Sequence, residues 1–452
     1  MDQGIDHIRS QNVMVQAPYK NEQLLADFQT LQENSVAWIS EIRSTAMDTF
    51  GEIGLPTARK GNEKWKYTNV APIARIEYKL SKPAAVSLDQ IKATAPWDDS
   101  WLNLVFVNGV LRSDLVRSDV DGVSVFSIAE EANLDEPCST IIDYLGSVTD
   151  VSDEGFAALN TSFLSDGIAI EIAPGVQSEL PLNIIFFDDG TTNSISHPRV
   201  LIVARPNSAI SVIESYVGGG SKCTLTNSIS EIIVGERASV SHYRLLAETD
   251  ETYDIGYGRV KLGSKAKFKS RSFFRSAKIG RYDLNVLIDG EGATCDLKGL
   301  YFTSGSQHMD NFINIDHAKP NGTSYLFYKG ILDGRSRAVF GGTVLVRKFA
   351  QKTDSIQYDK NLLLSPHAEV DSKPALFIYA DDVKCAHGAT AGNIDADTIF
   401  YMRSRGMDLE TASKLLIYGF AGEIIDAVEI DGLKDFLEDM FLTALPSHKF
   451  EF

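Results

Sequence analysis

The sequence feature that most constrains the fold is a small polar turn that recurs at a nearly constant interval. The turn reads RPNSAISV, VGERASV, LGSKAKF and DGEGATCDL. Its alanines are separated by 29, 28 and 27 residues: Ala209, Ala238, Ala266 and Ala293. The pattern resumes in DGRSRAVF and LSPHAEV, whose Ala338 and Ala368 are 30 residues apart, with PNGTSYLF offset between the two sets. One turn type at one period predicts coils that stack, with small residues where corners meet.

The segments between these turns predict the fold class. From about Ala157 to Gly392 they are short, rich in β-branched and aromatic residues, and without a helical stripe. The sequence therefore predicts a mainly β protein, a β-helix or related β-solenoid with long coils. The alternative is a large sandwich with regular turns, although sandwich loops rarely hold so even a spacing.

Helical patterns flank this region on both sides. The N-terminal stripes are Leu24, Leu25, Phe28 and Leu31, then Trp38, Ile39, Ile42, Ala46 and Phe50. Asn108-Gly109 predicts a β-hairpin within LNLVFVNGVLRSDLV. Near the C-terminus Asp395 or Asp397 can cap a helix ended by Gly406, and Asp408 can cap the next. The expected stripes there are Ala412, Leu415, Leu416, Gly419 and Phe420, then Leu433, Phe436, Leu437, Met440 and Phe441.

We expect three regions: residues 1–155 as an N-terminal helical region with a hairpin, 156–394 as the β-helix core, and 395–452 as a C-terminal helical region. The net charge of −18 argues against binding to nucleic acid or to anionic membranes. Four scattered cysteines fit a reducing compartment, and residues 1–16 lack the apolar stretch of a secretion signal. No apolar run reaches a membrane-spanning length, so we expect a soluble, cytoplasmic protein.

The candidate chemistry centres on ADDVKCAHGAT, where Cys385 and His387 are two residues apart. On a strand both side chains project to one face, where a thiolate and an imidazole can offer two ligands to a metal. Two ligands do not close a structural site, so others must come from elsewhere in the fold or from a second subunit. The alternative is that both are core-filling residues. Further scattered candidates are His308, Asp310, Asp316, His317 and His367.

Several stretches resemble one protein family. They are LVRKFAQKTDSIQYDKNLLLSPHAEVDSKPALFIYADDVKCAHGATAG, the following IFYMRSRGMDLETASKLLIYGFAGEII, and the N-terminal GLPTARKGNEKWKYTN. These resemble the SufB/SufD family, the β-helix subunits of the SufBCD iron–sulfur cluster assembly complex. The run D-D-V-K-C-x-H-G-A-T and the N-terminal signature favour the SufD type.

The resemblance implies a right-handed parallel β-helix between N- and C-terminal helical regions. It implies a non-catalytic scaffold that pairs with a SufB-like subunit through the C-terminal part of the β-helix and docks a SufC-like ATPase on its C-terminal helices. It assigns docking to Tyr401, Arg403, Arg405, Leu415 and Leu416. His387 would act on iron or a nascent cluster at the subunit interface, with Cys385 as its neighbour; no tightly bound cofactor is expected, only transient iron or cluster.

Two other functions stay open. A β-helix carbohydrate-active enzyme would need carboxylates on adjacent coils, for which only the pairs Asp188-Asp189 and Asp381-Asp382 are available. A homodimeric assembly protein that works without a SufB-like partner is the second, since related β-helix edges can pair with themselves.

Overall fold

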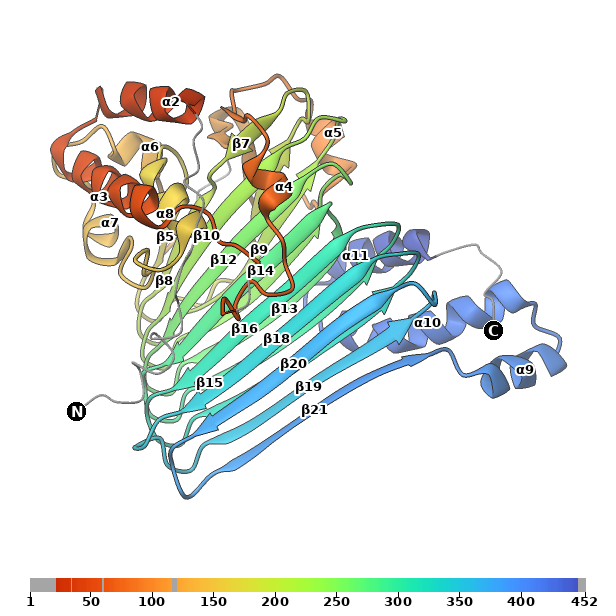
Figure 1. The fold of residues 1–452 in the computed structure, drawn as a ribbon. Helices are drawn as coiled ribbons and strands as arrows, with labels where there is room; N and C mark the ends of the chain where they lie inside the picture. The colour runs from red at the N-terminus through yellow and green to blue at the C-terminus, as the bar shows by residue number, and fades with distance from the viewer. Residues whose placement is uncertain (1–21, 34, 59–60, 116–119, 446–452) are drawn as a thin grey trace.

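The computed structural model describes residues 22–33, 35–58, 61–115 and 120–445. The N-terminal stretch in which we found no secretion signal lies outside these residues. Within them the chain is mainly β, with two long facing sheets that run from the N-terminal helices to a free end at β20 and β21 (Figure 1).

Each sheet takes every second strand of the chain. The first sheet contains, in spatial order, β4 (Val123–Ser127), β5 (Ile168–Ile172), β8 (Arg199–Ala204), β10 (Leu225–Val234), β12 (Tyr253–Leu262), β14 (Ile279–Ile288), β16 (His308–His317), β18 (Arg337–Val346) and β20 (Glu369–Ile378), with the short β1 (Lys79–Leu80) and β7 (Ser194–Ser196) beside it. The second contains β3 (Val110–Leu111), β2 (Leu102–Val107), β6 (Leu182–Asp188), β9 (Ala209–Gly218), β11 (Ser239–Ala247), β13 (Lys267–Ser276), β15 (Thr294–Thr303), β17 (Thr323–Leu332), β19 (Asp354–Leu363) and β21 (Lys384–Asn393).

This strand order confirms the parallel β-solenoid. Strands β10, β12 and β14 pair in parallel along their whole length, as do β15, β17 and β19 in the other sheet. Each coil therefore contributes one strand to each sheet, an arrangement that antiparallel sandwich strands cannot produce. The right hand of the coil stays a prediction.

The recurring turn forms one stacked corner of the solenoid. Each corner has a residue with positive φ whose backbone N–H donates to a carbonyl of the next corner, as Asn207 does to Glu236, Arg237 to Ser264, Lys265 to Glu291 and Asn321 to Gln351. The following residue is buried and small, as predicted: Ser208, Ala238, Ala266 and Ala293. Stacked corners leave no room for a larger side chain at that position.

The register corrects two details of the predicted repeat. Ala209 pairs with Ser239, so the true equivalent of Ala238 is Ser208. Ala338 pairs with Val370, two residues beyond Ala368, and the offset Asn321 belongs to the first set of turns. Matching the alanines gave the correct repeat length but not the exact register. Serine and glycine fill the small corner position as well as alanine does.

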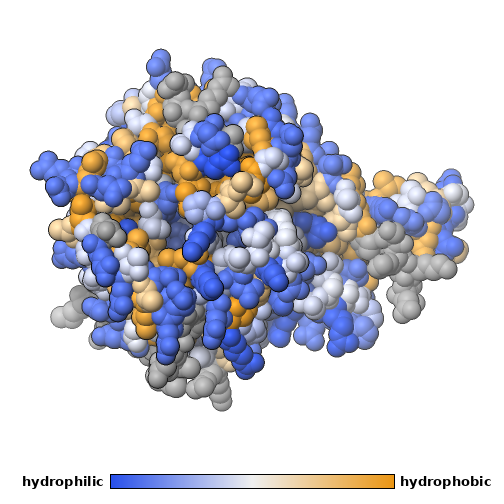
Figure 2. All heavy atoms as spheres, turned by 90° about the horizontal axis from the view of Figure 1, so that it is seen from above, coloured by the Kyte–Doolittle hydropathy of each residue, from blue (hydrophilic) through white to orange (hydrophobic). Residues whose placement is uncertain are grey.

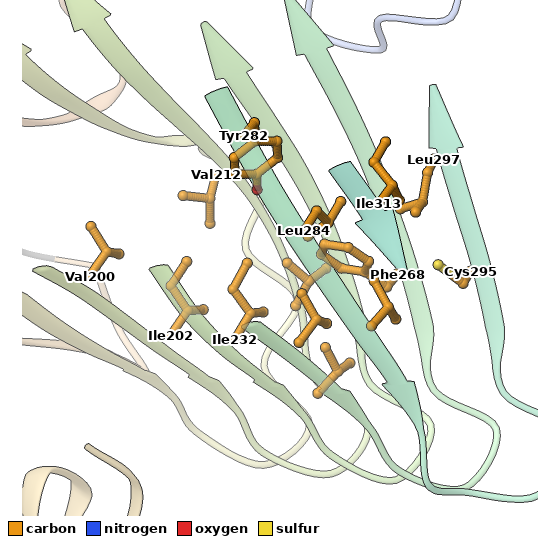
Figure 3. Packing of buried hydrophobic residues seen from close by; sticks show 14 of the residues in the cluster. Val200, Ile202, Val212, Ile232, Phe268, Tyr282, Leu284, Cys295, Leu297 and Ile313 are labelled. Atoms are coloured by element: carbon orange, nitrogen blue, oxygen red, sulfur yellow. The ribbon is translucent and has the colours of Figure 1, made fainter. Parts of the chain in front are cut away.

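The interior between the sheets is largely apolar. Its earlier coils also enclose a buried polar cluster, in which His242 contacts Glu214 and Arg244 pairs with Asp254. In Figure 3, Val212 and Phe268 from one sheet point toward Tyr282, Leu284 and Ile313 from the other. Period-two alternation places one face of each strand in this core and the other face outward, where helices or solvent meet it.

Most of the N-terminal helices cover part of the outer face of the first sheet (Figure 1), whereas α5 and η1 lie against the second. The N-terminal helices are α2 (Glu22–Glu33), α3 (Ala37–Ile53), α4 (Ala71–Ala74), α5 (Leu88–Lys92), the 3-10 turn η1 (Ser113–Leu115), α6 (Ile128–Glu131), α7 (Ser139–Tyr144) and α8 (Gly155–Ser162). Helices α2 and α3 and the hairpin β2–β3 confirm their predictions; the hairpin turns at Asn108 and Gly109, both with positive φ.

Helix α8 shows that the predicted start of the strand series was wrong. All eight of its residues are buried, including the polar Asn160, Thr161 and Ser162, so it has no exposed face and its sequence shows no helical stripe. It packs on α3, where Gly155 lies so close to Gly54 that an added Cβ would fall under 3.0 Å from the Gly54 carbonyl oxygen. Strand β2, from the predicted N-terminal region, extends the second sheet by pairing in parallel with β6.

The C-terminal helices are α9 (Ala396–Ser404), α10 (Leu409–Ile425) and α11 (Asp431–Ala444). Asp395 and Asp408 cap α9 and α10 as predicted, each accepting a hydrogen bond from a threonine N–H. Helices α10 and α11 pack on the outer face of the second sheet, and α9 projects beyond β21 (Figure 1). In the described part of the chain, no helix has the length and apolarity that a membrane crossing requires.

Candidate functional site

The two ends of the solenoid differ in whether their edge strands are covered by a further strand. At the N-terminal end the sheets close with antiparallel strands, β4 on β5 and β3 on β2. At the C-terminal end β20 and β21 are edge strands of ten residues each, and within the described residues neither pairs with a further strand on its outer side. We call this the open end. Long unpaired edges present rows of backbone donors and acceptors that can pair with another chain.

Cys385 and His387 lie on β21, at the open end. They pair in register with Ser355 and Gln357 of β19, which puts both side chains on the interior face. Cys385 is half-buried against the core, and burial raises the pKa of its thiol. His387 is exposed. The structure thus brings the two candidate ligands side by side on a strand that solvent and a partner can reach.

The coil beneath them has a largely polar interior, which the sequence reasoning missed. Four interior positions of β19 are polar and at most 4% exposed: Ser355, Gln357, Asp359 and Asn361. Asp359 accepts hydrogen bonds from Ser372 Oγ at 2.6 Å and Asn361 Nδ2 at 2.7 Å, both on one carboxylate oxygen. Burial raises its pKa to about 6. An alternating S-x-Q-x-D-x-N run inside a solenoid was the signal that could have revealed this.

The other candidate ligands are dispersed. On the outer face of the first sheet His308 bonds Thr68, Asp310 pairs with Arg281 and Asp316 with Arg347. His317 is buried beside Ser324, and burial lowers its pKa to about 4. His367 lies in an exposed turn. In the ranges that the structure describes, no three His, Cys, Asp or Glu side chains are arranged to hold a metal.

The carboxylate pairs considered for carbohydrate chemistry are also separated. Asp188 ends β6 and is buried, whereas Asp381 and Asp382 precede β21, and six strands lie between β6 and β21. A glycoside hydrolase needs two carboxyl groups within roughly 5–10 Å. These two pairs do not combine into such a site.

The N-terminal Trp-Lys-Tyr-Thr stretch is anchored on the outer face of the first sheet. Trp65 is buried, and the Arg281 guanidinium carbon lies 4.1 Å from its ring centroid. Thr68 Oγ1 is 2.9 Å from His308 Nε2 and also donates to Asp310. Lys64 pairs with the buried Glu154 at 2.8 Å. These contacts tie the signature to β14, β16 and the start of α8.

The predicted partner-binding residues lie at or next to α9 and α10, where several large apolar side chains are exposed. Tyr401 is 58% exposed and Leu415 is 49% exposed, with Phe400 and Met407 also exposed; these four form what we call the α9–α10 patch. Figure 2 shows hydrophobic residues among hydrophilic ones on the part projecting to the right. Arg403 is exposed, Leu416 is half-buried, and the Arg405 guanidinium carbon lies 5.2 Å from the Tyr401 ring centroid.

The side of α10 that packs on the sheet differs in part from the predicted one, and this leaves Leu415 on the surface. The helix buries Ala412, Ser413, Ile417, Ala421, Gly422, Ile424 and Ile425. Leu415 and Gly419, expected in the core stripe, are exposed instead. Helix α10 is apolar around most of its circumference, so periodicity alone could not say which side meets the sheet.

Comparison with known proteins gives consistent matches along the chain. Residues 20–184 match the SufBD protein N-terminal region, and residues 186–420 match the SUF system FeS cluster assembly SufBD core domain. The chain is 31% identical over 404 residues to an iron–sulfur cluster assembly SufBD family protein of Synechocystis, covering 87% of this chain and 88% of that protein. It is 31% identical over 384 residues to the iron–sulfur cluster assembly protein SufD of Escherichia coli, covering 84% and 87%. It is 28% identical over 416 residues to the chloroplastic protein ABCI7 of Arabidopsis thaliana, covering 89% and 85%.

Proposed function

The chain belongs to the SufBD family of SUF iron–sulfur cluster assembly proteins, and from this premise we propose that it is a non-catalytic scaffold subunit of a cluster assembly complex. It pairs through the open end with a SufB-like subunit and carries a SufC-like ATPase on its C-terminal helices. His387, with Cys385 beside it, contributes ligands from this subunit to iron or a nascent cluster at the paired edges.

The observation that carries the proposal is the combination of two ten-residue unpaired edges with an exposed His387 on one of them. A β-helix partner that continues both sheets would satisfy the edge N–H and C=O groups. Its side chains would then supply the remaining ligands of a metal bound by the two residues that this chain offers. A site divided between two subunits forms only on assembly, which couples complex formation to iron binding.

The α9–α10 patch supports the ATPase contact. Its exposed apolar residues lie on a projecting helical unit that also exposes Arg403 and Arg405. Apolar surface rimmed by polar residues is typical of protein–protein interfaces, where arginine and aromatic side chains supply much of the binding energy. ATP hydrolysis in the docked protein would move the helices and, through α10, the sheet on which α10 packs.

Purification from native lysate tests the partnership. We expect the tagged chain to recover one SufB-like and one SufC-like protein. Recovery of neither would refute the proposed complex. Mass measurement of the isolated chain and of the co-expressed set separates the heterocomplex from a homodimer that works alone, because the homodimer would persist when all three proteins are present.

Replacing His387 by alanine tests the site. Because the side chain is exposed, the variant should fold and assemble normally, while anaerobic cluster formation on the assembled complex falls. The matched control is His367→Ala, which removes an exposed turn histidine on the same chain. An unchanged cluster yield for His387→Ala, with the complex intact, would exclude His387 from the chemistry.

A further inference from the structure

A pocket of about 680 Å³ lies in the N-terminal helical region, at the end of the molecule opposite β20 and β21 (Figure 1). Its walls come from α2, α3, α6 and the segment 79–82, which contains β1. Small-molecule sites in proteins typically enclose roughly 300–1,000 Å³, so this pocket has the size of a ligand site. The proposed function gives it no role.

Arg43 is the buried cation of this pocket. It extends from α3 and is only 3% exposed. Its Nε donates at 2.9 Å and its Nη2 at 2.5 Å to the Leu164 carbonyl oxygen, and Nη1 donates to Ser35 Oγ. Ser35 and Ser165, which follows Leu164, also line the pocket, so the guanidinium borders it. These bonds use three of the five guanidinium N–H groups and leave two for a ligand.

The charge of Arg43 is not balanced in the way that the other buried arginines are balanced. Six arginines of the described chain are buried. The other five each pair with a carboxylate of the fold: Arg199 with Glu231, Arg244 with Asp254, Arg259 with Asp283, Arg271 with Asp296 and Arg281 with Asp310. Burial lowers the pKa of Arg43 to about 10, and no carboxylate of the described residues lies near enough to raise it again.

A purely structural link would not need this charge. Arg43 joins α3 to the segment after α8, but it does so through a carbonyl and a hydroxyl oxygen, both neutral acceptors. A neutral amide side chain can donate to such acceptors, and burying it costs far less than burying a cation. A buried guanidinium that borders a pocket and has no carboxylate partner therefore indicates that an anion binds beside it.

The other charges of the pocket favour a doubly charged anion. Lys79 and Lys82 line it and are exposed. The one carboxylate of its described lining is Asp27, which accepts hydrogen bonds from Gln23 Nε2 at 2.9 Å and from the Leu80 N–H at 3.4 Å. Three cations and one carboxylate give this lining a net charge of +2, in a chain whose net charge is −18. A phosphate monoester carries about −1.5 to −2 at pH 7, which matches this charge.

We propose that the pocket binds a small phosphorylated molecule, with Arg43, Lys79 and Lys82 contacting its phosphate group. The two remaining Arg43 N–H groups donate to phosphate oxygens, and the lysines contribute point charges from the rim. The phosphate then supplies the counterion that the fold does not, and it links α2, α3 and α6 to β1. The inference is independent of the proposed function, because the pocket shares no residue with the open end or the α9–α10 patch.

Calorimetric titration of the purified full chain tests the site with inorganic phosphate, glycerol 3-phosphate and glycerol. We expect both phosphate-bearing probes to bind and to raise the thermal midpoint, and glycerol to do neither. Arg43→Gln should weaken glycerol 3-phosphate binding about tenfold or more, and Arg43→Lys should restore part of the affinity. Lys82→Gln should weaken binding to a smaller extent. The matched control is Lys267→Gln, which removes an exposed lysine on β13 and should leave the affinity unchanged.

The two phosphate-bearing probes also identify the source of the phosphate. Tighter binding of glycerol 3-phosphate supports an organic phosphate, and equal affinities support the site with free phosphate as a sufficient ligand. Failure of both probes to bind, or an Arg43→Gln variant that binds as the unmodified chain does, overturns the inference. Should Arg43→Gln not fold, the double variant Lys79→Gln/Lys82→Gln decides, because both side chains are exposed: an unchanged affinity refutes the assignment.

Discussion

Replacing Gly330 by alanine tests whether the polar interior of β19 requires glycine, which has no side chain, at this position of β17. Gly330 faces the interior on β17, where an added Cβ would fall under 3.0 Å from both Tyr301 Cε2 and Asn361 Oδ1. The Tyr301 hydroxyl passes this position to donate to Asn361 Oδ1 at 2.5 Å. The glycine therefore lets a tyrosine on β15 reach across β17 to β19.

The expected cost of this substitution has three parts. Overpacking a close-packed interior by one methyl group costs about 1–3 kcal/mol. Displacing Tyr301 leaves its buried hydroxyl without Asn361, at about 1–3 kcal/mol. Alanine recovers about 0.4–1 kcal/mol because it restricts the unfolded chain more than glycine does. We expect the free energy of unfolding to fall by about 2–4 kcal/mol.

Urea unfolding of the purified chain measures this change. The control is Gly392→Ala on β21, where an added Cβ meets nothing within 4 Å. It should change stability by about 0.5 kcal/mol or less. In a double-mutant cycle, Tyr301→Leu should make Gly330→Ala less costly, with a coupling of about 1 kcal/mol or more. Equal unfolding free energies for the two glycine variants, or strict additivity with Tyr301→Leu, would refute the reasoning.

Three further changes are predicted. Trp65→Ala removes a buried ring that packs on Arg281 and Phe156, and should lower the free energy of unfolding by about 3–5 kcal/mol in the same urea assay. His317 is held neutral in the fold, with a pKa of about 4 against 6.5 when unfolded, so protons favour the unfolded state as pH falls; relative to His317→Gln, the unmodified chain should lose up to about 3 kcal/mol between pH 6.5 and pH 4. Leu415→Glu should abolish co-purification of the ATPase without lowering the thermal midpoint, whereas the matched exposed-leucine control Leu442→Glu on α11 should retain it.

The sequence was most informative where local chemistry decides the conformation. Asn108-Gly109 adopts the two positive φ angles of a tight hairpin, and Asp395 and Asp408 cap their helices, because each outcome depends on only a few neighbouring atoms. The 27–30-residue period likewise predicted stacked coils, since corners repeat whatever the strands between them contain.

The features that could not be predicted are those set by tertiary packing, that is, by which face of an element contacts which other element. Helix α8 is buried on all sides, and α10 could have turned either apolar face to the sheet, so neither shows a pattern that identifies its partner. The polar interior of β19 was missed for a similar reason. Gln357 is thirty residues from His387 and becomes its neighbour only through the parallel register of β19 and β21.

The same register explains why function should concentrate at one end of this molecule. Within a solenoid every internal strand has its backbone groups satisfied on both sides, so only the end coils can recruit another chain without breaking existing hydrogen bonds. The antiparallel strands β3 and β4 occupy that position at one end, leaving β20 and β21 at the other. Under the proposed function, His387 and Cys385 on β21 would bind iron only once a partner pairs with this edge, so metal affinity would depend on assembly. Substitutions there should therefore change complex formation and iron binding more than the stability of the remaining coils, which each contact only their neighbours.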